Sequence, residues 1–115
     1  MNSRYELPLA FGAANGPVWL PDAEIDLCET YRDAVRMCWM HRRSKGMTQA
    51  TLAELSGLYA SHVSDYLSAD PERRNLPAER ISAVEAICGN RAITQWEMRQ
   101  RGLTVMEEVI ARKAA

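Results

Sequence analysis

The chain has 115 residues, of which 47% are hydrophobic and 25% charged, and its formal net charge at pH 7 is −1. These values are ordinary for a globular protein, and the length allows one domain with a modest core. No apolar stretch approaches the ~20 residues of a transmembrane helix, and no signal peptide is recognised, so we expect a cytoplasmic protein that does not enter a membrane.

The cysteine pattern argues against a metal centre or a disulfide framework. The sequence has three cysteines, an odd number, and their spacing matches no metal-binding motif. We therefore expect Cys28, Cys38 and Cys88 to be reduced thiols, as is usual in a cytoplasm. The chain also shows no glycine-rich phosphate loop and no nucleophile elbow, so we expect neither a cofactor nor catalysis.

Residues 1–30 are expected to form an acidic N-terminal arm that is partly irregular. Prolines and glycines recur up to Pro21, which disfavours regular structure there. One arginine is set against five acidic residues, a net charge of −4. Asp22 is expected to cap a helix that runs through Ile25 and Cys28 into the next one. Four apolar residues could hold the arm to the body or to a second subunit: Phe11, Val18, Trp19 and Leu20.

Residues 31–45 have the periodicity of a helix. Tyr31, Val35 and Cys38 fall on one side, which would face the core. The segment ends in a basic turn followed by Gly46, and both features favour a helix C-terminus. The sequence therefore predicts a helix over residues 31–45 that contributes to the core.

A shorter helix and a tight turn are expected next. Thr48 can act as an N-cap by accepting a hydrogen bond from an unpaired amide. Leu52, Ala53 and Leu55 give this helix an apolar side. Gly57 follows the last periodic residue, where a helix can end in a left-handed conformation that glycine enters at little cost.

A second short helix is expected to start between Tyr59 and Ser61. Val63, Tyr66 and Leu67 repeat at a helical interval and should face the core. The remaining positions should then lie towards solvent, and they are Ala60, Ser61, His62, Ser64 and Asp65.

Two further segments complete the chain. A polar loop over residues 68–75 leads to another helix, with Pro77 at its first position and Gly89 at its end. Residues 91–115 then show two short helical patterns. The first of these ends at Gly102, and Thr104 can cap the second.

The paired short helices resemble the helix-turn-helix of the Cro and lambda-repressor type, the XRE family. The matching residues are Gly46-Met47-Thr48-Gln49, Leu52-Ala53, Gly57-Leu58, Val63 and Ser64. The resemblance covers about residues 31–90 and implies an all-α fold, a compact bundle of four to six helices with residues 31–90 as the DNA-binding domain. A plain helical hairpin is the alternative, but the residue types at these offsets favour the helix-turn-helix.

In this family the second helix of the motif enters the DNA major groove, and the first braces it on the phosphate backbone. The resemblance therefore places five side chains near base edges: Ala60, Ser61, His62, Ser64 and Asp65. The residues expected at the phosphate backbone or its sugars are Arg42, Arg43, Lys45, Thr48, Gln49, Tyr59, Arg73, Arg74 and Asn75. Their basic members would supply most of the non-specific affinity through counterion release.

The chain departs from the family pattern in the second helix, which contains none of the Arg, Lys, Gln or Asn side chains that read bases best. Asp65 could accept from a cytosine amino group or pair with an arginine of the following loop. His62 could donate to guanine or simply be exposed. His41 stands at a position that is often apolar in the family, and we expect its imidazole to be half-buried and hydrogen-bonded.

Helices beyond the fourth often make the dimer contact in this family, which assigns that role to residues 91–115. The interface residues expected there are Trp96, Val105, Met106, Val109 and Ile110. The alternative is that these helices fold back on their own core. A palindromic binding site is the physical reason to expect a dimer.

The sequence therefore predicts a transcriptional regulator of bacteria or bacteriophages, a repressor that binds a palindromic operator in double-stranded DNA as a homodimer. Residues 31–101 carry eleven Lys and Arg against eight Asp and Glu, a net of +3 where DNA would bind. The alternative is a protein-interaction module of the antitoxin or phage accessory type, which would use the apolar arm or the C-terminal helices to bind a protein partner. The acidic arm and the non-basic second helix favour that alternative.

Overall fold

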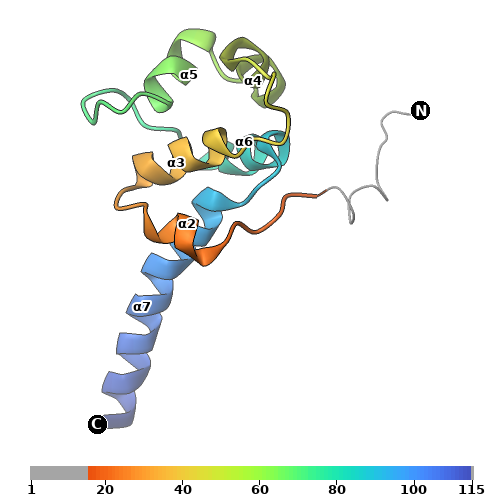
Figure 1. Ribbon diagram of the computed structural model, residues 1–115. Coiled ribbons are helices and arrows are strands. Elements are labelled where there is room, and N and C mark those ends of the chain that lie inside the picture. The colour runs from red at the N-terminus through yellow and green to blue at the C-terminus, as the bar shows by residue number, and fades with distance from the viewer. Residues whose placement is uncertain (1–15, 115) are drawn as a thin grey trace.

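Helices make up nearly all of the regular structure (Figure 1). The computed structural model describes the backbone of residues 16–114 and the side chains of residues 16–102, 109, 110 and 113. The expected all-α fold is confirmed for this part of the chain, and none of its helices combines the length and apolar character needed to cross a bilayer. The helices are α2 (Asp22–Asp26), α3 (Tyr31–Met40), α4 (Gln49–Ser56), α5 (Ala60–Tyr66), α6 (Ile81–Cys88) and α7 (Ala92–Ala114), with a 3₁₀ turn over Ala78–Arg80 before α6.

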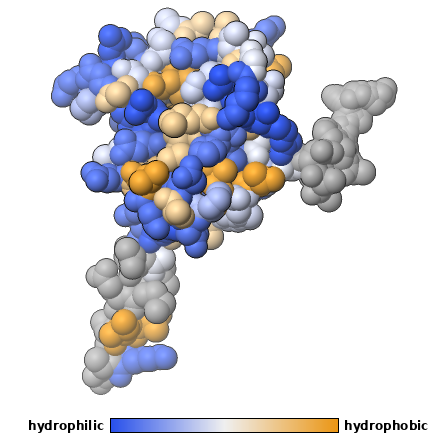
Figure 2. Space-filling view, in the orientation of Figure 1, coloured by the Kyte–Doolittle hydropathy of each residue, from blue (hydrophilic) through white to orange (hydrophobic). Residues whose placement is uncertain are grey.

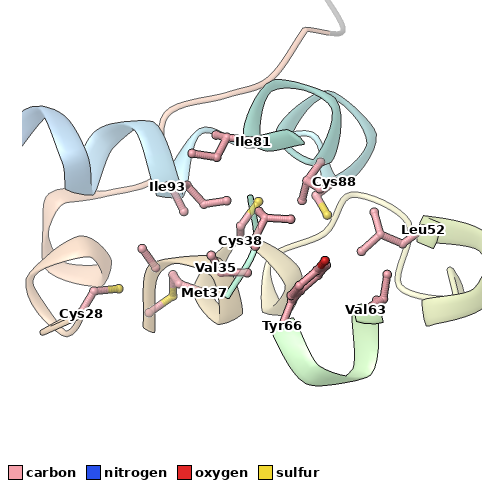
Figure 3. Close-up of a cluster of buried hydrophobic side chains, with 14 of the residues drawn as sticks. Cys28, Val35, Met37, Cys38, Leu52, Val63, Tyr66, Ile81, Cys88 and Ile93 are labelled. Carbon is pink, nitrogen blue, oxygen red and sulfur yellow. The ribbon is translucent and has the colours of Figure 1, made fainter. Parts of the chain in front are cut away.

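The core is built around α3, which contacts α2, α5, α6 and α7. Its buried side carries Ala34, Val35 and Cys38, each at most 2% exposed. Figure 3 shows apolar side chains of α4, α5, α6 and α7 converging on this side of α3. The periodicity of residues 31–45 therefore predicted the central helix of the core.

Local signals end α4 and α6 where the sequence predicts. The expected end of the preceding helix at Gly46 was wrong, because α3 ends at Met40 and the basic turn belongs to the loop before α4. The Thr48 hydroxyl accepts a hydrogen bond from the Thr51 amide at 3.2 Å and caps α4. Gly57 and Gly89 end α4 and α6 in the left-handed region, with φ angles of +71° and +87°, a conformation that glycine adopts without steric cost. The connection between α4 and α5 consists of residues 57–59 alone.

The segment before α2 is fixed to the body by Leu20. The Gln95 side chain accepts from the Leu20 amide at 2.8 Å and donates to the Leu20 carbonyl at 2.9 Å. Leu20 is buried, whereas Val18 and Trp19 are more than half exposed, at 52% and 58%. Phe11, the remaining apolar residue expected to anchor the arm, lies outside the described residues.

The expected continuity of α2 and α3 was wrong. α2 ends at Asp26, and α3 begins afresh because Thr30 adopts an extended conformation and forms a capping box with Asp33. The Thr30 hydroxyl accepts from the Asp33 amide at 3.1 Å, and the Asp33 carboxylate accepts from the Thr30 amide at 3.2 Å. Asp22 does not cap α2 either, because Pro21 occupies the capping position.

The expected break in the C-terminal part was also wrong. α7 runs from Ala92 to Ala114 and passes through Gly102 as continuous helix. A glycine inside a helix costs about 1 kcal/mol relative to alanine. A break would leave several backbone groups without their helical partners, so the uninterrupted helix is favoured.

Two further positions differ from the expectation. Leu55 is 62% exposed, because α4 packs through Leu52 and Ala53 on its other side. Pro77 precedes the 3₁₀ turn instead of starting an α-helix, and α6 begins only at Ile81.

Candidate nucleic-acid interface

α4 and α5 form a tightly connected pair at one end of the molecule, away from the free end of α7 (Figure 1). Leu52 and Ala53 of α4 and Val63 of α5 are at most 3% exposed. The Leu58 amide donates to the Ala53 carbonyl at 2.9 Å across the turn, and the Leu58 side chain packs partly buried against the core. These contacts fix the orientation of α5 at the surface.

The outer side of α5 carries short side chains. Val63 and Tyr66 face the core, so helical geometry directs Ser61 away from it. Ala60, Ser61 and Ser64 are all exposed, and the Ser64 hydroxyl donates to the Ser61 carbonyl at 2.9 Å. Side chains this short would let the helix backbone approach base edges closely.

The other two residues expected near bases, His62 and Asp65, are half-buried and belong to a cluster with Arg73 and Arg74, here called the Asp65 cluster. Asp65 accepts from Arg73 Nη1 at 3.0 Å and from Arg74 Nε at 2.9 Å. Arg74 Nη1 lies 2.7 Å from His62 Nε2, and because a guanidinium can only donate, the imidazole nitrogen accepts. Of the two alternatives for Asp65, the structure contains the pairing with the following loop.

His62 is packed between aromatic rings and is not simply exposed. Its ring meets Tyr59 edge to face with centroids 5.0 Å apart, and it meets Tyr66 at 6.3 Å. Tyr59 is itself 73% exposed at the start of α5. The Tyr59 ring therefore supports His62 on one side and remains accessible to a ligand on the other.

Arg32 is a structural residue of this region that the sequence analysis missed. The residue is 7% exposed, and its guanidinium donates to the Asp65 carbonyl at 2.7 Å and to the Ser68 carbonyl at 3.0 Å. It also donates to the Arg73 and Arg74 carbonyls and to Asn75 Oδ1 at 3.1 Å. The available signal was an arginine between Tyr31 and Ala34, close to the expected core side of α3, followed later in the chain by a long loop whose carbonyls need donors.

The basic residues before α4 are engaged with backbone carbonyls. The Arg42 guanidinium stacks over Trp39, 4.1 Å from the ring centroid, and donates to the carbonyls of Trp39, Lys45 and Met47 at 3.1, 2.9 and 3.1 Å. Arg43 donates to the Gly16 carbonyl at 2.7 Å, and Lys45 donates to the Met40 carbonyl at 2.7 Å. These side chains order the α3–α4 loop, and their predicted phosphate contacts would come in addition.

The start of α4 offers polar groups to a ligand. The Thr48 side chain is exposed, although its hydroxyl already caps α4 and lies 3.1 Å from Thr51 Oγ1. Gln49 is exposed, and its side-chain amide makes no hydrogen bond within the part of the chain that the structure describes. Gln49 is therefore the better placed of the two to bind a phosphate or a neighbouring base.

Several ionisable side chains of the core have displaced pKa values. Burial raises the pKa of Tyr31 to about 12. The hydrogen bond between Cys38 and Cys88 raises the pKa of the first thiol and lowers the pKa of the second. All three cysteines are free thiols in the structure, and all three are buried. His41 Nε2 lies 2.8 Å from a Glu24 carboxylate oxygen, which is the half-buried, hydrogen-bonded imidazole that the sequence predicted.

The residues expected at a dimer interface fall into different environments. Trp96 is half-buried, packs against the core and donates to the Cys28 carbonyl at 3.2 Å, so the first half of α7 folds onto its own core. Val109 and Ile110 are 38% and 62% exposed. The side chains of Val105 and Met106 lie outside the described residues.

Comparison of the chain with protein-family models, with curated proteins and with solved structures finds no match.

Proposed function

We propose that this protein is a sequence-specific DNA-binding regulator of a bacterium or bacteriophage, a cytoplasmic repressor that binds a palindromic operator as a homodimer. One observation carries the proposal: α4 holds α5 at the surface with short polar side chains outward, and two arginines border that side. The major groove of B-DNA, about 12 Å wide, admits a single α-helix. A helix with this outer side can approach base edges without a steric obstacle.

The charges around α5 suit a phosphate-lined groove. Asp65 alone would repel phosphates, but Arg73 and Arg74 both pair with it, so the three side chains together carry one positive charge. Gln49 at the start of α4 would reach the backbone beside the groove. Affinity would then come from phosphate contacts, and sequence preference from α5 and its borders.

The shape of α7 supports a dimer. Its C-terminal half extends away from the helical body (Figure 1). Figure 2 shows hydrophobic surface at this end, where Val109 and Ile110 are exposed. Two copies joined there would carry two copies of α5, one for each half-site of an inverted repeat.

Selection of bound duplexes from a random DNA pool, followed by affinity measurements against salt, tests the proposal. We expect an enriched inverted repeat and an affinity that falls steeply as salt rises, because several phosphate contacts release counterions. Gln49→Ala should weaken binding on every duplex, and Glu54→Ala, an exposed change on the same helix, should not. Absence of enrichment together with salt-insensitive binding would reject the proposal.

A protein-interaction module is the second candidate, and one surface feature favours it. A shallow pocket of about 260 Å³ is lined by Trp19, Asp22, Gln95, Met98 and Arg99. Trp19 and Met98 are 58% and 55% exposed there, and large exposed apolar side chains are often interaction sites. If no DNA sequence is enriched, Trp19→Ala should be the first variant compared with the native chain in a search for a protein partner.

A further inference from the structure

We propose that Arg74, a residue of the loop after α5, is the guanine-reading side chain of this interface. The inference rests on the proposed function and names the base contact that α5 itself lacks. α5 contains no Arg, Lys, Gln or Asn, and arginine is the side chain that most often reads guanine. The fold brings an arginine from outside the helix to the border of its outer side.

The hydrogen bonds of Arg74 leave three of its five N–H donors available to a ligand. Its Nε donates to Asp65 Oδ2 at 2.9 Å, and one Nη1 hydrogen is directed to His62 Nε2 at 2.7 Å. A guanidinium has five N–H donors, so one hydrogen on Nη1 and both on Nη2 have no partner among these contacts. The remaining Nη1 and Nη2 hydrogens are donors of the kind that bind the O6 and N7 acceptors of guanine.

The position of Arg74 is held from both ends. Its side chain, 55% exposed, is fixed by Asp65 and His62 on the surface of α5. Its backbone carbonyl accepts from the buried Arg32 guanidinium at 3.1 Å, and the same guanidinium binds the Asp65 carbonyl at 2.7 Å. An arginine fixed in this way loses little conformational freedom when it binds, which favours an oriented base contact over a mobile phosphate contact.

Helical geometry places these donors beside the groove-facing side chains. Ser61 is directed away from the core, and His62 and Asp65 border it on one flank of α5. Arg74, bound to both of them, therefore lies along the same flank. A guanine read by Arg74 would be a neighbour of the base pair that Ser61 meets.

Arg73 provides a matched control within the same loop. Its side chain is 56% exposed, close to the 55% of Arg74, and it also donates to Asp65. Unlike Arg74, it lies between two carboxylates, with its Nε 3.8 Å from Asp70 Oδ2, and no contact with His62 orients it. We therefore infer that Arg73 pairs with Asp65 and does not read a base.

The test uses the full chain and the duplex that selection enriches. In that duplex, each guanine of a half-site is replaced in turn by 7-deazaguanine, which lacks the N7 acceptor. At one position the replacement should weaken the native chain about tenfold or more, as for a bidentate contact. With Arg74→Met the same replacement should have little further effect, because methionine has no donor for N7. Arg73→Met should respond to 7-deazaguanine as the native chain does.

Asp65→Asn gives a second readout that a purely structural role would not produce. Removing the carboxylate should raise affinity for random duplexes, because a negative charge near phosphates is lost, and should lower the preference for the guanine. The helical circular dichroism of each variant verifies that it folds. The inference is overturned if Arg74→Met weakens all duplexes equally, or if Arg73→Met abolishes the 7-deazaguanine effect. If the native chain enriches no duplex at all, the proposed function fails, and the inference fails with it.

Discussion

At the scale of single residues, Arg32 links the core to the candidate interface. A buried charge is costly unless its donors are satisfied. Arg32 meets this condition with the carbonyls of Asp65, Ser68, Arg73 and Arg74 and the side chain of Asn75. The carbonyls of Ser68, Arg73 and Arg74 are therefore hydrogen-bonded although the loop over residues 68–75 has no regular secondary structure. The positions of Arg73 and Arg74 depend on a residue of α3 that would not touch DNA.

Arg32→Met should therefore destabilise the fold and loosen the loop together. We expect a loss of about 2–4 kcal/mol in the free energy of unfolding, because several carbonyls lose their shared donor. Urea denaturation followed by circular dichroism measures this loss. Arg36→Met is the control, since Arg36 is only half-buried and donates to the Leu67 carbonyl at 3.3 Å. Equal losses in the two variants would contradict the role assigned to Arg32.

At the scale of helices, the ends that depend on local chemistry were the ones the sequence could predict. Thr48 caps α4, and Gly57 and Gly89 end α4 and α6, because these residue types act within one turn of their own position. The capping box of Thr30 and Asp33 is an equally local signal, and it was readable but missed. Gly57 ends α4, whereas α7 continues through Gly102. Which of the two a glycine does depends on how the following residues pack, and a single sequence does not show that packing.

The candidate site also has features that the sequence could predict and features that it could not. The exposed positions of α5 follow from helical periodicity once Val63 and Tyr66 are assigned to the core. The pairing of Asp65 with a loop arginine could be framed only as one of two alternatives. The contacts of Arg74 with His62 and with Arg32 depend on the path of the loop in three dimensions, which no periodicity encodes.

Substitution by alanine should have opposite effects at Gly102 and at Gly57. Gly102 is exposed with nothing within 4 Å of a new Cβ, so Gly102→Ala should increase helical circular dichroism and stabilise α7 by up to about 1 kcal/mol. Gly57 has a φ of +71°, so Gly57→Ala should destabilise the fold by about 1–2 kcal/mol. Thermal unfolding of both variants measures the contrast. A loss of helix in Gly102→Ala would show that α7 is interrupted at this position after all.

At the scale of the whole molecule, the two candidate surfaces lie far apart. α4 and α5 lie at one end, where Ala60, Ser61 and Ser64 are exposed, and the exposed Val109 and Ile110 lie toward the far end of α7 (Figures 1 and 2). The longest dimension is 57 Å and the shortest 25 Å. Such an elongated outline separates the proposed nucleic-acid interface from the proposed contact with a second copy, so each could be altered without disturbing the other.

The separation gives the last prediction, which concerns the dimer. Ile110 is 62% exposed and should lie in the contact between two copies of α7. Ile110→Glu should therefore convert a dimer into a monomer in sedimentation equilibrium, because two buried carboxylates would face each other. Its affinity for a single half-site should be unchanged, whereas its affinity for the full inverted repeat should fall to the half-site value, since the second binding event is no longer linked to the first. Lys113→Glu, also on exposed α7 surface, should leave the dimer intact. A monomeric native chain would contradict the proposed dimer and the palindromic operator with it. A dimer that survives Ile110→Glu would show that the contact between the two copies does not lie at this end of α7.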